Sequence, residues 1–179
     1  SVHLPMRPLL MGHVLTAVVL DQLARQRVGQ KHAVALLPLL FVVWANVHPS
    51  WPVGLAFLAL ALVAGVALPR LGLSARLGLG GTALGARDAR TLGVVLALSC
   101  AAPLVRPDTL DGALYPFVHV LGLGAEAGEI IEWFPLSPTD PLHVATLAGL
   151  ALVAVALVRA RGARDAFDLL VVLLVTALV

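Results

Sequence analysis

The stretch VGLAFLALALVAGVAL, residues 53–68, has sixteen residues and no charged side chain. Trp51 and Pro52 precede it, and Pro69 and Arg70 follow it. A run of this length and composition is typical of a helix that crosses a lipid bilayer. The whole chain has the same character, with 60% hydrophobic residues, 12% charged residues and a mean hydropathy of +0.98. Because so few charges cannot coat the surface of a soluble domain, we predict a polytopic membrane protein.

The fold class that follows is all-α, a bundle of transmembrane helices that forms a single domain over residues 1–179. About six spans fit into this length at roughly 20 residues each. They are predicted at residues 8–23, 32–45, 53–68, 91–105, 143–158 and 167–179. Because several are shorter than a full span, we expect either that their helices extend into the interface or that the bilayer thins locally. The sequence starts and stops abruptly, and we expect it to be a piece of a longer protein.

A few residues interrupt the predicted spans. Asp21 lies four residues before Arg25, and this spacing predicts an ion pair at the membrane edge. His13 lies deeper in the same span and is expected to form a hydrogen bond inside the bundle. Pro38 is expected to kink the second span, and Pro103 is expected to kink or end the fourth.

The basic residues are distributed so unevenly that they predict which loops share a side of the membrane. Ten of the 12 Lys and Arg lie in three connectors on one side: Arg25, Arg27 and Lys31; Arg70, Arg76, Arg87 and Arg90; Arg159, Arg161 and Arg164. Cytoplasmic loops are enriched in such residues. The composition, rich in Ala, Leu, Val, Arg and Gly, favours a bacterial origin. We therefore predict an inner-membrane protein with these connectors in the cytoplasm and the segment 107–141 outside.

The segment 107–141 is the most polar part of the chain and carries six of its ten acidic residues. Its first part, residues 110–123, predicts a short interfacial or re-entrant helix. Glu129 and Glu132 follow, three residues apart. Such a pair can serve acid–base chemistry or bind a divalent cation, or the two can be solvated acids in a loop that neighbouring aromatic residues anchor. No zinc site is predicted, because the outer histidines lack zinc-ligand spacing: His48, His119 and His143.

Several short motifs of the outer side occur together. They are Trp44-Ala45-Asn46-Val47-His48 with Gly54, then Arg106-Pro107-Asp108 through Gly112 with Tyr115-Pro116, and Ile131-Glu132-Trp133, with Arg7-Pro8 before the first span. These motifs resemble a family of bacterial multi-span proteins related to the GT-C glycosyltransferases, such as the protein mannosyltransferases. The resemblance implies transfer of a sugar from a polyprenyl-phosphate donor at the outer membrane face. It places the family's catalytic Asp in a loop upstream of Ser1, so the catalytic residue of this chain stays unknown.

The resemblance also implies roles for the outer polar residues. The candidates for contact with the lipid phosphate are Arg7, His48 and Arg106. The candidates for contact with an acceptor or a divalent cation are Glu129, Glu132 and Asp108.

Two other functions stay open from the residues alone. One is a non-catalytic subunit of a larger membrane complex, whose small-residue helices pack against partner subunits. The other is a part of a transporter or channel, for which the polar residues within the spans are the supporting feature. Membrane lipid is the expected partner in every case, and no nucleic-acid partner is expected.

Overall fold

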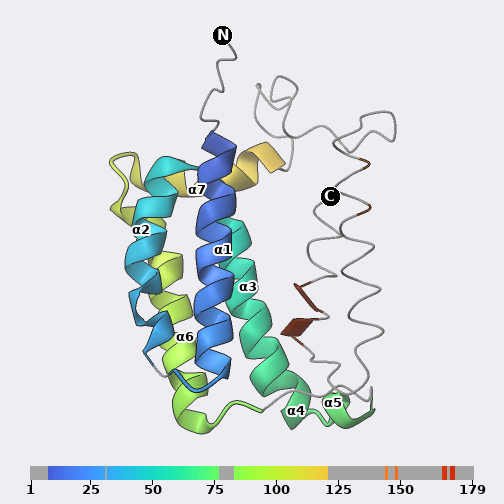
Figure 1. Ribbon diagram of the computed structural model, residues 1–179. Helices are drawn as coiled ribbons and strands as arrows, with labels where there is room; N and C mark the ends of the chain where they lie inside the picture. Colours follow the sequence, from blue (N-terminus) through green and yellow to red (C-terminus); the bar gives the residue numbers. More distant parts are fainter. Residues whose placement is uncertain are drawn as a thin grey trace. The chain divides into compact units, whose positions relative to one another are not determined.

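The computed structural model describes residues 8–30, 32–76 and 83–120, and the single positions 144, 148, 167, 168, 170 and 171. The described segments are helical, with turns between the helices and no strand among them (Figure 1). The predicted all-α class is therefore confirmed for this part of the chain. By compactness the chain divides into two units: Ser1–Ala59 with Gly85–Ala127, and Leu60–Leu84 with Gly128–Val179.

The helices follow one another with short connections. In chain order they are α1 (Pro8–Arg27), the 3-10 turn η1 (Ala33–Leu36), α2 (Leu37–Val47), α3 (Trp51–Leu62), the π-helix η2 (Val63–Ala67), α4 (Leu68–Arg70), α5 (Leu73–Arg76), α6 (Ala86–Ala101), the 3-10 turn η3 (Ala102–Val105) and α7 (Thr109–Val120). The predicted helices over 8–23, 32–45, 53–68 and 91–105 are all present. The predictions for 143–158, 167–179 and the outer segment beyond Val120 fall almost entirely outside the described residues.

Two helical stretches, Trp51–Arg70 and Ala86–Val105, are each 20 residues long and apolar enough to cross a membrane. The first stays continuous through a π-turn, where the carbonyl of Gly65 accepts a hydrogen bond from the backbone N–H of Leu84 at 2.8 Å. The second changes from α to 3-10 geometry at its end, where Pro103 lies in the first turn of η3. Pro38, Pro69 and Pro103 thus fall at helix starts or changes of helix type, where a missing N–H is tolerated, whereas Pro116 lies inside α7. Pro38, which was expected to kink the second span, lies in the first turn of α2.

In the first unit, α1, α2, α6 and the start of α3 lie side by side and form a bundle (Figure 1). Its interior is apolar and tightly filled, with these side chains essentially inaccessible: Val19, Leu23, Val34, Leu37, Phe41, Trp44, Phe57, Leu58 and Leu92. Its outside carries large apolar side chains as well, among them Val14, Leu39, Val43, Val94 and Leu98. The interior and the outer flank of the bundle are therefore both hydrophobic.

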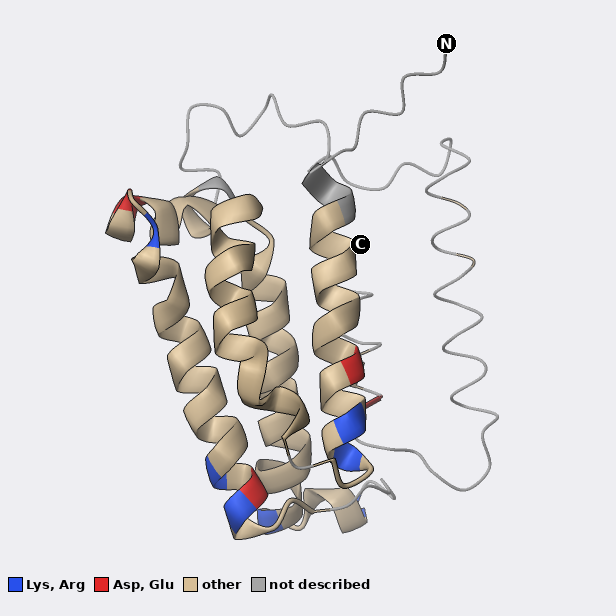
Figure 2. Cartoon of the chain, turned by 60° about the vertical axis from the view of Figure 1, so that its left-hand side comes forward, with Lys and Arg blue, Asp and Glu red and all other residues tan. Residues whose placement is uncertain are grey.

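Charged residues of this unit lie near the two ends of the bundle (Figure 2). Arg25 and Arg27 close α1, and Arg87 and Arg90 lie in the first turns of α6 at the same end. Asp21 accepts a hydrogen bond from Arg25 Nε at 2.7 Å, which confirms the predicted ion pair. The opposite end is where α2 ends, α3 begins and η3 leads into α7.

Candidate functional site

The polar contacts at the end opposite Arg25 centre on the turn that joins α2 to α3. The buried indole of Trp44 donates its Nε1–H to Ser50 Oγ at 3.1 Å. Ser50 Oγ lies 2.8 Å from His48 Nδ1, and the backbone N–H of Ser50 donates to the same nitrogen at 3.1 Å. Because a backbone N–H can only donate, Nδ1 of His48 is an acceptor and carries no proton. The ring is therefore neutral with its proton on Nε2, and the hydroxyl of Ser50 donates to Nδ1.

Helix α1 passes directly over this turn at Gly12. A Cβ on Gly12 would lie 2.6 Å from Ser50 Oγ and 3.3 Å from His48 Nδ1. Any side chain there would press on the two atoms that form the hydrogen bond. Thr16, one turn later, donates its hydroxyl to the carbonyl of Gly12 at 2.8 Å. A glycine at this position thus lets α1 cover the His48–Ser50 pair.

The indole of Trp44 is held from its other side by α3. A Cβ on Gly54 would lie 2.5 Å from Trp44 Cζ3 and 2.8 Å from Phe41 Cζ. The rings of Phe41 and Trp44 stack with centroids 5.5 Å apart and planes at 28°. All three groups are buried, so the orientation of the indole N–H toward Ser50 is set by packing.

Arg106 connects the end of α2 to the turn before α7. Its Nη1 donates to the carbonyl of Ala45, one of the last carbonyls of α2, which have no partner inside the helix. Its Nε and Nη2 donate to the two carboxylate oxygens of Asp108 at 2.8 and 2.9 Å. A cation at a helix C-terminus is also favoured by the helix dipole. Arg106 therefore acts as a cap on α2 and as the bidentate partner of Asp108.

The turn that carries Asp108 is built around this ion pair. Thr109 has a φ of 42°, in the left-handed region, and the backbone carbonyl of Asp108 accepts N–H bonds from Asp111 and Gly112. The carboxylate of Asp108 lies against Gly112, where no Cβ would fit. The hydrogen bond from Arg106 lowers the pKa of Asp108, and the same bond raises the pKa of Arg106. The motif from Arg106 to Gly112 is thus one local structure, with Gly112 placed where the carboxylate needs room.

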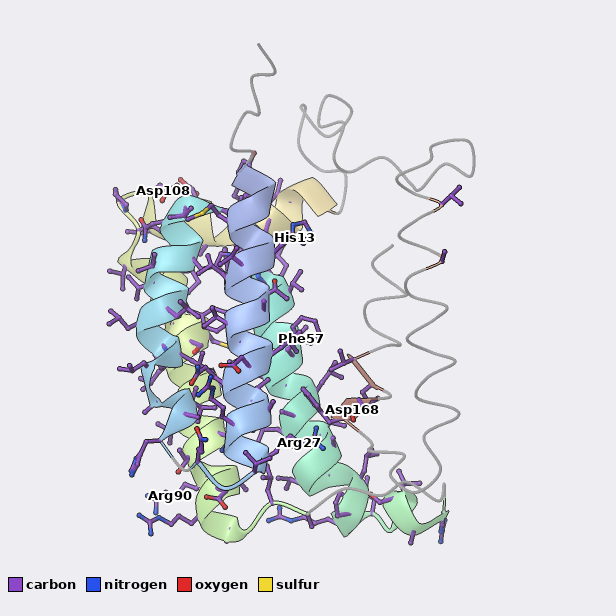
Figure 3. All side chains as sticks on the ribbon, in the orientation of Figure 1. His13, Arg27, Phe57, Arg90, Asp108 and Asp168 are labelled. Carbon is purple, nitrogen blue, oxygen red and sulfur yellow. The ribbon has the colours of Figure 1, made fainter. Side chains whose placement is uncertain are left out.

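Three of the six site residues predicted from the sequence belong to this region. His48 is half-buried at the end of α2, and Arg106 and Asp108 lie at the same end of the bundle. Asp108 and His13 are labelled in Figure 3. His13 is exposed on α1, so the expectation of a hydrogen bond inside the bundle is wrong for this residue. The remaining candidates lie outside the described residues: Arg7, Glu129 and Glu132. Within the described part of the chain no three His, Cys, Asp or Glu side chains come together as a metal site.

Sequence reasoning did not single out Ser50, Gly12 or the packing of Trp51. Trp51 is 3% exposed, and its ring meets Phe117 of α7 edge-on with centroids 5.8 Å apart. Its buried Nε1 has no hydrogen-bond partner among the described residues. The signal for Ser50 was present, since a buried indole N–H usually requires an acceptor and few polar residues lie nearby in sequence. The covering by Gly12 had no such signal, because it depends on how two helices cross.

No family model, curated protein or solved structure matches the chain. The likeness to GT-C glycosyltransferases therefore stays a prediction from short motifs. What the structure adds is that two of these motifs, Trp44 to His48 and Arg106 to Gly112, are joined through the bond between Arg106 and the Ala45 carbonyl.

Proposed function

We propose that the chain is a multi-span integral membrane protein of the bacterial inner membrane. The observation that carries this is the belt of exposed apolar side chains along the bundle. On η1 and α2 they follow one stripe at helical spacing, Leu36, Leu39, Val43 and Val47. On α6 and η3 they follow another, Val94, Leu98 and Val105. Full burial of such a side chain stabilises by roughly 1.5–3 kcal/mol, and in water the exposed part of each side chain would forgo its share of that free energy, whereas lipid acyl chains accept it.

The proposed orientation puts the arginine-rich end of the bundle in the cytoplasm. In the first unit Arg25 and Arg27 end α1, and Arg87 and Arg90 begin α6 at this end (Figure 3), whereas Arg106 lies at the end of α2. A cytoplasmic excess of arginine is the usual pattern in inner-membrane proteins. The His48–Ser50 turn and the Arg106–Asp108 pair then face the extracytoplasmic side.

We further propose that this outer end contacts a polyprenyl-phosphate sugar donor, as the likeness to GT-C glycosyltransferases implies. The support is that the motifs behind the likeness come together at one end of the bundle. Arg106 supplies a fixed positive charge, and His48 is a neutral imidazole with its proton on Nε2. Such groups can hold a phosphate that leaves with negative charge.

The second candidate is a non-catalytic subunit of a larger membrane complex. The observation that favours it is the engagement of Arg106, whose Nε, Nη1 and Nη2 all donate to acceptors of this chain. A guanidinium held in this way serves the fold without any ligand. Under this proposal the outer end is a rigid docking platform for another chain.

A binding experiment separates the two proposals. The full chain in lipid nanodiscs is titrated with a short-chain polyprenyl phosphate while the fluorescence of its tryptophans is followed. If the outer end binds the sugar donor, the fluorescence should change saturably, and the affinity should be about tenfold lower for Arg106→Gln than for the wild type. Arg87→Gln, which removes an exposed arginine at the opposite end, is the matched control and should bind like the wild type.

Circular dichroism confirms that each variant keeps its helices, and Arg106→Lys provides a second variant that retains the charge but not the bidentate geometry. If the fluorescence of the wild type shows no saturable change, the proposal that the outer end binds the sugar donor fails. Co-purification with a second membrane protein in fixed ratio would then support the subunit proposal.

A further inference from the structure

Helix α7 presents an apolar face away from the protein. Leu110, Leu114, Phe117 and Val118 are 63%, 53%, 45% and 36% exposed. Their spacing of four, three and one residues puts them on one side of the helix. On the other side Gly112 and Pro116 are buried.

The buried side of α7 is already in place against the bundle. α7 lies crosswise at the end where α2 finishes, and it packs against η3 (Figure 1). Phe117 lies at the border between the two sides, because it is partly exposed and also meets the buried ring of Trp51. The Arg106–Asp108 pair fixes the turn from which α7 starts. The exposed face therefore cannot be covered by turning the helix over, because that would break these contacts.

The chemistry of the exposed face fits a lipid surface better than a protein partner. No polar side chain interrupts the stripe, and it continues onto the exposed Leu104 and Val105 of η3, where the apolar belt of the bundle ends. Polar groups border it along one edge, where Asp111 and Tyr115 lie four residues apart and are both exposed. Helices with such a face lie in the boundary between headgroups and acyl chains.

We propose that α7 is an interfacial helix that lies in the plane of the outer leaflet with this face among the acyl chains. The inference rests on the membrane placement proposed above but not on glycosyl transfer. α7 carries one acidic residue, Asp111, and no Lys or Arg, so its insertion is driven by apolar contact and does not need anionic lipid. It would fix the outer end of the bundle at the level of the headgroups.

The test places a fluorescent label at single cysteines in the full chain, in nanodiscs that hold one copy. Cys100, the only native cysteine, is replaced by Ala. The labelled positions are Leu114→Cys and Val118→Cys on the face, Asp111→Cys on its edge, and Val94→Cys in the belt on α6. Quenching by lipids brominated near the headgroup or near the chain end measures depth, and quenching by aqueous iodide measures contact with water.

The inference expects both face positions at a similar depth of about 5–10 Å, protected from iodide and unaffected by anionic lipid. Asp111→Cys should remain open to iodide. Iodide access at both face positions would overturn the proposal, and so would protection that requires a second copy or a partner protein. A steady increase in depth from Leu114 to Val118 would show a re-entrant helix and would also overturn it. If Val94→Cys itself is open to iodide, the membrane placement fails rather than this inference alone.

Discussion

Replacing Gly54 by alanine tests the packing that orients the Trp44 indole toward the candidate site. The new Cβ would lie 2.5 Å from Trp44 Cζ3 and 2.8 Å from Phe41 Cζ, whereas carbon atoms normally pack at about 3.5–4.0 Å. Neither ring has room to withdraw, because both are fully buried and stack on each other. Overpacking of this kind costs roughly 1–3 kcal/mol, but alanine in a helix also stabilises by about 1 kcal/mol relative to glycine.

The matched control is Gly93→Ala on α6, where nothing lies within 4 Å of the added Cβ. Both variants gain the same stability from helix propensity, so the difference between their unfolding free energies isolates the cost of overpacking, about 1–3 kcal/mol. At roughly 2–4 °C per kcal/mol for a chain of this size, Gly54→Ala should unfold about 2–12 °C below Gly93→Ala. Thermal unfolding in nanodiscs, followed by tryptophan fluorescence, measures the difference. Equal midpoints for the two variants would refute the contact between α3 and Trp44.

Three further outcomes are expected at the same end of the bundle. Ser50→Ala should destabilise the fold by roughly 1–3 kcal/mol, because the buried N–H of Trp44 loses its acceptor, whereas Ser74→Ala on the short helix α5 should have little effect in the same unfolding assay. Arg106→Gln should lower the unfolding midpoint and shift the emission of Trp51, because it removes the cap of α2 and loosens the start of α7; an unchanged midpoint and spectrum would argue against the cap. The difference in unfolding free energy between the wild type and Asp108→Asn should be constant between about pH 5 and 8 and should shrink only in stronger acid. A carboxylate whose pKa is lowered in the folded state stabilises the fold above its ordinary pKa of 3.8, and this stabilisation is lost as the pH falls through the lower pKa of the folded state. A difference that already changes near neutral pH would contradict this assignment.

The spanning helices were predictable because hydrophobic runs bounded by proline and charge carry their own signal. The residues at which these helices begin and end were less predictable. Residues 91–105 were expected, but the helical stretch begins at Ala86, because Arg87, Asp88 and Arg90 continue the helix beyond the apolar part. Hydropathy marks where a bilayer would end, whereas backbone hydrogen bonding decides where the helix ends. The same limit applies at α3, which was expected to begin at residue 53 and begins at Trp51, with Pro52 in its first turn.

The candidate site was predictable only in its local parts. The pairing of Arg106 with Asp108 joins residues two apart, and the His48–Ser50 turn is equally local. The bond from Arg106 to Ala45 spans 61 residues and has no sequence signal, since any late carbonyl of α2 is an equally good acceptor. The crossing of α1 at Gly12 is of the same kind.

This long-range bond bears on how far the motifs can be taken as a sign of glycosyl transfer. The Trp44 to His48 stretch and the Arg106 to Gly112 stretch occur together in this chain, and one structural reason is that the second caps the helix end of the first. A protein that needs only a rigid outer end would keep both stretches for that reason. Motif co-occurrence therefore supports the donor-binding and the subunit proposals equally. The difference lies in the guanidinium of Arg106, which has five N–H groups. Asp108 takes two of them at 2.8 and 2.9 Å and the Ala45 carbonyl takes a third, so no hydrogen bond among the described residues uses the second N–H of Nη1 or of Nη2. Binding of the sugar donor requires a lipid phosphate to reach these two N–H groups, whereas a docking platform requires only that the three bonds to Asp108 and Ala45 stay intact.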